Sequence, residues 1–254
     1  MDQNEIPTYR EFLKDSLRLK INFHLTDQNQ GVEPPPLQKP PHPEQRVITL
    51  PGKEAWKAFA GTDLIDAIDG RQSHRRFRDA PLSLAELAFL LWATQGIRDI
   101  IGPGVALRTV PSAGCRHAFE TYLCISHVED LDPGIYRYLP IDHALVLERE
   151  VEADLLRRSL SRATLNQTFV AAAPVTFVWS VIPYRMEWRY HIAAHRVIAM
   201  DAGHVCQNLY LASQAVGAGT CAIAAYNQDL MDELVQVDGQ DEFVIYLAPV
   251  GKVG

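Results

Sequence analysis

Arginine is concentrated in one short stretch of the chain, Arg71-Gln72-Ser73-His74-Arg75-Arg76-Phe77. Arg78 follows directly, so four arginines fall within eight residues of a chain whose formal net charge is −7. Arginine binds phosphate oxygens through paired N–H groups, and a serine hydroxyl between two arginines can complete the contacts. The stretch therefore predicts an anion site, most simply for phosphate. The alternative is a basic turn that faces water.

A second segment suited to binding is Pro111-Ser112-Ala113-Gly114. These residue types are typical of a tight turn, which can present backbone N–H groups and a hydroxyl. The run Gly217-Ala218-Gly219-Thr220 is weaker as a dinucleotide fingerprint, because it follows a predicted helix rather than a strand. It is explained more simply as the end of a helix where two backbones approach closely.

Metal and nucleophile chemistry find little support in the sequence. His191 and His195 are four residues apart, but the glutamate of an H-E-x-x-H motif and a third ligand are lacking, so exposed helix histidines are favoured. No G-x-S-x-G segment points to a hydrolase. The four cysteines have no C-x-x-C spacing and are predicted to be buried free thiols: Cys115, Cys124, Cys206 and Cys221. No metal site is expected.

The composition excludes several classes of partner. The acidic net charge argues against nucleic acid, because proteins that bind it usually carry a basic surplus. No apolar run approaches the roughly 18 residues of a membrane helix. The polar first fifteen residues are not a secretory signal. We therefore expect a cytoplasmic protein without nucleic-acid or membrane partners.

Two parts of the chain are predicted, an N-terminal arm over residues 1–60 and a domain over residues 61–254. Six of the 16 prolines lie between Pro34 and Pro43, which indicates extended, polyproline-like chain. This segment is either a disordered linker or an arm across a partner subunit, and flanking apolar residues favour the arm. Four apolar residues before it have helical spacing: Tyr9, Phe12, Leu13 and Leu17.

Four helices are predicted within the domain, one of them a polar helix within about residues 148–165. The first spans Thr62–Gly70, with Thr62 or Asp63 as its cap, and the second opens with a capping box of Ser83 and Glu86 and ends at Gly96. The longest covers about residues 195–216. Its apolar positions recur at steps of four and three, which indicates a seam that packs along another helix: Ile198, Ala202, Val205, Leu209, Ala212 and Val216.

Strands alternate with these helices. Segments rich in β-forming residues predict strands near 121–128, 174–182, 220–225 and 243–250, and a hairpin joins 134–138 to 144–147. A glycine-containing loop is predicted at 101–104. Helices mixed with hairpins favour an α+β fold over a regular doubly wound one.

Four segments, in this order, resemble the FMN-dependent nitroreductase family, most closely its SagB-type dehydrogenase branch. They are Arg71–Phe77, Pro111–Gly114, Gly203–Leu209 leading into Gly217–Cys221, and Pro249–Lys252. Their order and spacing match over about residues 60–252. The resemblance implies a homodimer with a central mixed or antiparallel sheet flanked by helices. It also implies that the long helix lies at the dimer interface, its seam forming the dimer core, with two FMN molecules between the subunits.

The resemblance further implies which residues bind FMN. By position, Arg71, Gln72, Ser73 and Arg75, together with Lys252, would contact the phosphate and ribityl chain. A second set resembles residues that the partner subunit lays along the flavin ring: Pro111, Ser112, Ala113 and Gly114. A third set aligns with the segment against the ring near N5: Ala222, Ile223, Ala224 and Ala225. Many members carry a Glu-Gly pair where this chain has two alanines, so only the backbone N–H is left to reach N5.

The activity that the resemblance implies is that of an FMN-dependent oxidoreductase. NADH or NADPH would deliver hydride to flavin N5, and a small electron-poor acceptor would then be reduced. One alternative is an FMN dehydrogenase that oxidises a peptide or small-molecule precursor with oxygen as acceptor. The SagB branch carries a Lys-Tyr pair before the long helix, and Arg189-Tyr190 is the nearest match, so Tyr190 and Arg189 are the candidate catalytic pair. Arginine cannot act as a base near neutral pH, which weakens this alternative.

A third alternative is a catalytically silent flavin-binding partner subunit. The chain ends at Gly254, without the C-terminal extension that supplies another basic phosphate ligand in many members of the family.

Overall fold

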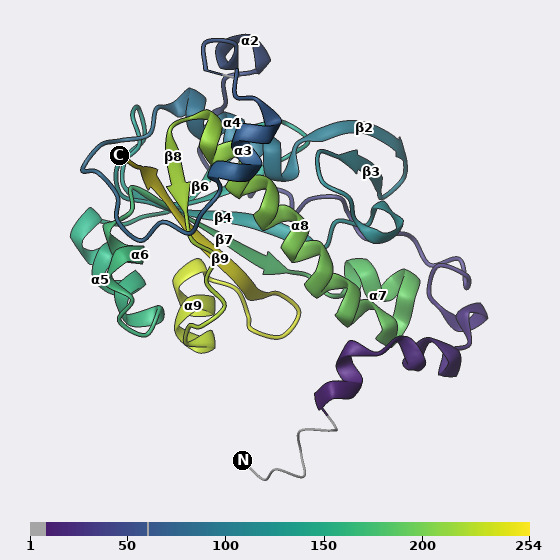
Figure 1. Ribbon diagram of the computed structural model, residues 1–254. Helices are drawn as coiled ribbons and strands as arrows, with labels where there is room; N and C mark the ends of the chain where they lie inside the picture. The colour runs from purple at the N-terminus through teal and green to yellow at the C-terminus, as the bar shows by residue number, and fades with distance from the viewer. Residues whose placement is uncertain (1–8, 60) are drawn as a thin grey trace.

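A central seven-stranded sheet organises the chain in the computed structural model, which describes residues 9–59 and 61–254 (Figure 1). Its strands are β1 (Val47–Thr49), β4 (Phe119–Ile125), β5 (Gly134–Leu139), β6 (Ala144–Glu150), β7 (Val175–Val181), β8 (Ala218–Thr220) and β9 (Phe243–Lys252). Their order is β1-β6-β5-β4-β7-β9-β8, and every neighbouring pair is antiparallel. A separate hairpin consists of β2 (Ile97–Gly102) and β3 (Val105–Arg108).

Helices cover both faces of the sheet. The α-helices are α2 (Lys53–Trp56), α3 (Leu64–Gly70), α4 (Leu84–Gln95), α5 (Ala153–Ala163), α6 (Thr168–Ala172), α7 (Tyr184–Tyr190), α8 (Ala194–Ala215) and α9 (Gln228–Val235). Short 3₁₀ turns are η1 (Glu11–Leu13), η2 (Asp15–Lys20), η3 (Phe23–Leu25), η4 (Ala113–Cys115) and η5 (His191–Ala193).

Alternation along the strands builds two apolar cores. Leu123 of β4 pairs with Phe177 of β7, and both belong to the core that α4 and α8 cover. Their neighbours Tyr122 and Val178 pair in the same register and face the opposite core, under α5 and α9. Successive side chains of a strand point to opposite faces, so β4 and β7, fully buried throughout, serve both cores. The expected α+β fold with a central antiparallel sheet is therefore confirmed.

Several predicted elements are confirmed. The side chain of Ser83 accepts a hydrogen bond from the backbone of Glu86, and Glu86 accepts one in return, so α4 begins with the expected capping box. Asp63, rather than Thr62, caps α3. The β5–β6 hairpin, the buried strand β7 and the 22-residue helix α8 also lie where the sequence places them.

Other elements differ from the sequence-based expectation. Instead of a loop at 101–104, a hairpin turns at Pro103-Gly104, where Gly104 has a φ of 62°. Strand β2 has mostly exposed residues and two register shifts, so no alternation marks it in the sequence. Helix α9, capped by the side chain of Asn227, lies in a segment for which no element was expected. Three residues of the N-terminal apolar pattern, Phe12, Leu13 and Leu17, lie in two short 3₁₀ turns and not in one continuous α-helix.

The proline-rich segment lies against its own chain. The carbonyl of Leu37 accepts a hydrogen bond from buried Arg108 at 2.7 Å, and the backbone N–H of Lys39 donates to buried Glu120 at 2.8 Å. Farther upstream, the indole of Trp188 donates to the carbonyl of Val32 at 3.0 Å. Strand β1 also lies within the predicted arm. These contacts order the segment without a partner subunit, and they do not describe a disordered linker.

The seam of α8 is buried within the chain, which corrects one expectation. All six seam residues lie in the core shared with α4 and the sheet: Ile198, Ala202, Val205, Leu209, Ala212 and Val216. The seam therefore packs against the same chain and is not available as the core of a dimer interface.

Candidate functional site

The arginine stretch runs alongside the short edge strand β8. Ser73 and Thr220 form an isolated parallel bridge, and the N–H of His74 donates to the carbonyl of Thr220 at 2.9 Å. Gly219 permits this approach, because a Cβ atom there would lie 2.5 Å from the imidazole of His74. The chain therefore brings the first and third sequence motifs together, and the glycine run serves close backbone approach, as expected.

One tyrosine hydroxyl joins these segments. Tyr210, near the C-terminal end of α8, has its Oη 2.9 Å from Oγ of Ser73. The same Oη accepts a hydrogen bond from the N–H of Ala222 at 2.8 Å. The hydroxyl thus ties the serine of the arginine stretch to the start of the segment that was expected near flavin N5.

Arg71 and Arg75 contact aromatic rings and not carboxylates. The guanidinium of Arg71 lies 5.3 Å from the centre of the Tyr210 ring, and that of Arg75 lies 5.8 Å from the centre of the Phe169 ring on α6. Within the part of the chain that the structure describes, neither has a carboxylate oxygen within 4.0 Å. Gln72 between them is exposed. Two arginines that flank an exposed serine and lack a counter-charge in an acidic protein are suited to bind an anion.

Lys252 lies near this loop but already has partners. Its Nζ forms an ion pair with Glu86 of the capping box and donates to the carbonyl of Val216 at 2.7 Å. Its backbone carbonyl accepts a hydrogen bond from the N–H of Arg78 at 2.8 Å. The lysine therefore joins the end of β9 to the start of α4 and the end of α8. Phosphate binding by Lys252 stays a prediction.

The Pro111–Gly114 segment lies toward the other end of α8. The N–H of Ala113 donates to Oδ2 of Asp201 at 3.3 Å, and Oγ of Ser112 accepts from the N–H of His117 at 3.0 Å. Burial raises the pKa of Asp201, and the hydrogen bonds from Ser112 and Ala113 oppose that rise. Asp201 thus fixes this turn on the long helix.

The candidate catalytic pair lies against the same turn. Gly114 has a φ of 61°, and a Cβ atom there would lie 2.6 Å from the hydroxyl of Tyr190 and 2.9 Å from Cδ of Arg189. The guanidinium of Arg189 also lies 5.5 Å from the centre of the Tyr190 ring. Two segments that the sequence places far apart are therefore adjacent, and glycine is the residue that allows the contact.

A pocket of about 350 Å³ opens beside this turn and includes Pro111 and Ser112 in its lining. Arg108 and His117, both buried, line it as well. Burial and the nearby Arg185 lower the pKa of Arg108 to about 10. Burial and the charge of Arg108 lower the pKa of His117 to about 3, so this imidazole is neutral at ordinary pH.

The two clusters are separated along one helix. Asp201, which holds the Pro111–Gly114 turn, and Tyr210, which holds Ser73, are nine residues apart on α8. At about 1.5 Å per residue, that spacing is roughly 14 Å. The two clusters therefore lie at different levels along the same helix.

The segment expected near N5 is partly exposed. Ile223 is buried and exchanges two backbone hydrogen bonds with Leu247, at 2.8 and 3.2 Å. Ala224 and Ala225 are exposed, and the carbonyl of Ala225 accepts from the side chain of Gln167 at 2.8 Å. Their N–H groups have no hydrogen-bond partner among the described residues, so they can donate to a ligand.

Sequence reasoning missed Tyr210 and Asp201. Both lie on the predicted long helix, at buried positions outside the apolar seam. A buried tyrosine or aspartate on such a helix needs a polar partner, and that requirement was the available signal. Asn208 of the Gly203–Leu209 motif has a structural part, because its amide donates to the carbonyl of Ala93 on α4 at 2.8 Å.

Metal and thiol chemistry gain no support. No group of three His, Cys, Asp or Glu side chains that could hold a metal ion occurs within residues 9–59 and 61–254. His195 instead contacts Glu187 at 2.7 Å and is half-exposed. Three of the four free cysteines are buried, and Cys115 is half-buried. Among the described residues, no helix is both long and apolar enough to span a bilayer.

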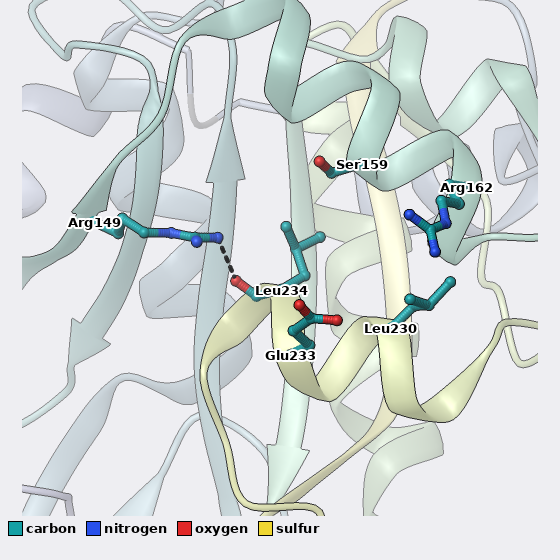
Figure 2. Close-up of a pocket in the computed structure, with 6 residues that line it drawn as sticks. All are labelled: Arg149, Ser159, Arg162, Leu230, Glu233 and Leu234. Atoms are coloured by element: carbon teal, nitrogen blue, oxygen red, sulfur yellow. Dashed lines mark hydrogen bonds between the residues drawn. The ribbon is translucent and has the colours of Figure 1, made fainter.

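Figure 2 shows a smaller pocket of about 170 Å³, between α5 and α9. Arg149 of β6 reaches across it and donates to the carbonyl of Leu234 at 3.1 Å. Arg162 and Glu233 are also in its lining. None of the residues expected to bind FMN or substrate lies in this pocket.

Comparisons with known proteins agree on one family. A model described as "Nitroreductase family" matches residues 68–252. A nitroreductase-type protein of Methanocaldococcus jannaschii is 32% identical over 207 residues, which cover 81% of this chain and 96% of that protein.

Two solved structures are also similar. The crystal structure of a nitroreductase-type protein from Ralstonia eutropha has a TM-score of 0.67 at 27% identity, and the match covers 87% of this chain and 94% of that one. A chain of the Escherichia coli microcin synthetase complex McbBCD has a TM-score of 0.61 at 22% identity, covering 84% and 79%, and so shares the fold.

Proposed function

The chain belongs to the nitroreductase family, and from this premise we propose that it binds FMN and acts as a flavin-dependent oxidoreductase. NADH or NADPH is the proposed electron donor, and a small electron-poor compound is the proposed acceptor. The family match confirms the family that the sequence motifs indicated. The cofactor, the electron donor and the acceptor are proposals that go beyond membership of the family.

The observation that carries the proposal is the loop of Arg71, Ser73 and Arg75. Its two guanidinium groups have aromatic rings beside them and, among the described residues, no carboxylate oxygen within 4.0 Å. The exposed serine lies between the two arginines in the chain. A phosphate dianion offers only acceptors, and this loop offers donors and positive charge. The residues therefore fit the phosphate end of FMN.

The remaining residues would hold the ring. When bound, FMN would supply hydride transfer at ring atom N5. The unpaired N–H groups of Ala224 and Ala225 are suited to donate to an acceptor atom of the ring. The turn at Pro111–Gly114, held by Asp201, would cover another part of the ring, and the adjacent pocket would admit the substrate.

A homodimer is part of the proposal, because one chain carries the two clusters about 14 Å apart on α8. A second copy would place its own Pro111–Gly114 turn opposite the arginine loop of the first. Apolar side chains on the outer surface near α8 support an interface there: Ile65 and Ile68 of α3 and Met200 of α8 are each at least half exposed. A solution mass of one chain would contradict this arrangement.

A second function in the same fold is an FMN dehydrogenase that oxidises a substrate and passes electrons to oxygen. The observation that favours it is the contact of Arg189 and Tyr190 with Gly114, because it places a polar pair at the expected substrate side. Anaerobic mixing of the flavin-loaded protein with NADPH and with NADH distinguishes the two. Rapid bleaching of the flavin absorbance supports the reductase, and a flavin that stays oxidised with both donors supports the dehydrogenase.

The proposal is tested first by the absorbance spectrum of the purified protein, followed by titration with FMN. We expect the visible absorbance bands of a protein-bound oxidised flavin, or their appearance as FMN is added. A protein that stays colourless and leaves FMN fluorescence unchanged would contradict the proposed function. Such a result would support a partner subunit without flavin chemistry.

A further inference from the structure

The hydroxyl of Tyr210 has two neighbours, and their chemistry restricts how its proton is placed. Oη lies 2.8 Å from the backbone nitrogen of Ala222 and 2.9 Å from Oγ of Ser73. A backbone N–H can only donate, so Ala222 uses one acceptor site of the phenol oxygen. The phenol proton is then free to be donated to Ser73.

The hydroxyl of Ser73 carries one proton as well, and either oxygen of the Ser73–Tyr210 pair could be the donor. If Ser73 donated to Tyr210, it would have no proton left for a ligand. If Tyr210 donates to Ser73, the serine proton is directed elsewhere. An ionised phosphate has only acceptor oxygens, so the serine can bind it only in the second arrangement.

We propose that Tyr210 is a positioning residue that makes Ser73 a hydrogen-bond donor to the phosphate of FMN. The chain of donors runs from the N–H of Ala222 to Tyr210, from Tyr210 to Ser73, and from Ser73 to a phosphate oxygen. This inference rests on the proposed function, since it requires that the arginine loop binds the FMN phosphate. It goes beyond that function by assigning a role to Tyr210, a buried residue that lies outside the four sequence motifs.

The surroundings of Tyr210 support this role. The residue is 9% exposed and lies on the 22-residue helix α8, so its hydroxyl is held by a rigid element, whereas Ser73 lies on an exposed loop. The guanidinium of Arg71 lies 5.3 Å from the centre of the same ring. One side chain thus sets the position of both an arginine and a serine of the loop. A phenylalanine would keep the ring contact and remove only the hydroxyl.

The experiment compares Tyr210→Phe, Ser73→Ala and the double variant with the unchanged protein. Dissociation constants are measured by fluorescence titration for FMN and for riboflavin, which lacks the phosphate. Tyr136→Phe is the matched control. Tyr136 is buried on β5, away from the loop, and its hydroxyl donates to the carbonyl of Asp132 at 2.8 Å. Melting temperatures of the flavin-free proteins show whether any variant unfolds.

For Tyr210→Phe we expect FMN binding to weaken about tenfold, as for the loss of a hydrogen bond to a charged group. Riboflavin binding should change less than about twofold, and Tyr136→Phe should change neither ligand by more than that. The double variant should bind FMN about as weakly as Ser73→Ala alone, because the tyrosine acts through the serine.

Two results would overturn the inference while the proposed function stands. One is an equal loss of FMN and riboflavin binding in Tyr210→Phe, and the other is a double variant in which the two losses multiply. If the unchanged protein binds no FMN, the proposed function itself fails and the inference fails with it. If Tyr210→Phe is too unstable to titrate, the FMN-to-riboflavin affinity ratio of Ser73→Ala decides. If that ratio equals the ratio of the unchanged protein, Ser73 does not contact the phosphate, and the inference fails.

Discussion

Arg137 and Arg185 are buried under the proline-rich segment, whereas Arg71 and Arg75 lie in a loop at the surface near β8. The buried pair has counter-charges inside the fold. Arg137 donates to Glu148 at 2.6 Å, and Arg185 forms an ion pair with Glu120. The carbonyl of Lys39 accepts a further hydrogen bond from Arg137 at 2.6 Å.

The surface pair has no such counter-charge among the described residues, and aromatic rings lie beside its guanidinium groups instead. The two pairs therefore illustrate two roles of arginine in this chain. An arginine whose charge is compensated by its own chain supports the fold. An arginine whose charge is left uncompensated, beside an exposed hydroxyl, is suited to bind a ligand. Substitutions of the residues in the two groups should therefore have different effects.

The largest effect is expected for Glu120→Ala. Glu120 is 2% exposed, and its carboxylate meets Arg185, Arg137 and the N–H of Lys39. Its loss leaves buried arginine charge uncompensated, so the free energy of unfolding should fall by about 3–5 kcal/mol. Urea unfolding measures this. Glu54→Ala, which breaks the exposed pair with Lys57, is the matched control and should change stability little. Similar losses in both variants would refute the structural role of the buried network.

A smaller, pH-dependent effect is expected at His117, which lies beside buried Arg108. The pKa of this imidazole falls from its ordinary 6.5 to about 3 in the fold, chiefly because of burial. Above pH 6.5 the imidazole is neutral in both the folded and the unfolded chain. As pH falls below 6.5, the unfolded chain takes up a proton that the folded chain does not, so the free energy of unfolding decreases. Between pH 7 and pH 5 the loss is about 2 kcal/mol.

His117→Gln should remove this part of the pH dependence, measured as the difference in unfolding free energy between pH 7 and pH 5. The contributions of the carboxylates are the same in both proteins and cancel in the comparison. An unchanged difference would show that His117 is not held neutral by its surroundings.

Lys252→Met tests a residue that was expected to bind phosphate but has partners within the fold, as the buried arginines do. Its side chain is 23% exposed, and its Nζ is paired with Glu86 and the carbonyl of Val216. If the lysine serves to bind these two groups and not FMN, the variant's free energy of unfolding should fall by about 1 kcal/mol and its FMN affinity should hardly change. A loss of FMN affinity as large as that of Arg71→Ala would instead place the lysine at the phosphate, as the family resemblance implies.

The fold was largely predictable because local signals and burial agreed. Three elements have a sequence pattern that indicates one type of secondary structure. They are α4 with its capping box, α8 with its apolar seam, and the buried strand β7. The β2–β3 hairpin has exposed residues and register shifts, so it has no such pattern. The seam of α8 was assigned to the wrong partner, because an apolar period gives the packing face of a helix but not what packs on it.

The candidate site was predictable as segments and not as contacts. Residue types marked the loop around Ser73 and the turn at Gly114, but no sequence rule placed Tyr190 against Gly114 or Tyr210 against Ser73. Such contacts join residues from distant parts of the chain and depend on how α8 lies relative to both segments. A lysine in a basic motif looks the same in sequence whether or not a carboxylate such as Glu86 is beside it.

FMN binding by two matched double variants tests directly whether Arg71 and Arg75 bind the phosphate. Arg71→Ala with Arg75→Ala removes the arginines that flank Ser73, and Arg76→Ala with Arg78→Ala removes the same charge from the same loop. We expect the first variant to purify mostly colourless and to bind FMN at least about a hundredfold more weakly, through the loss of two charged contacts. The second should stay within about threefold of the unchanged protein. A first variant that is as yellow as the unchanged protein would contradict the account.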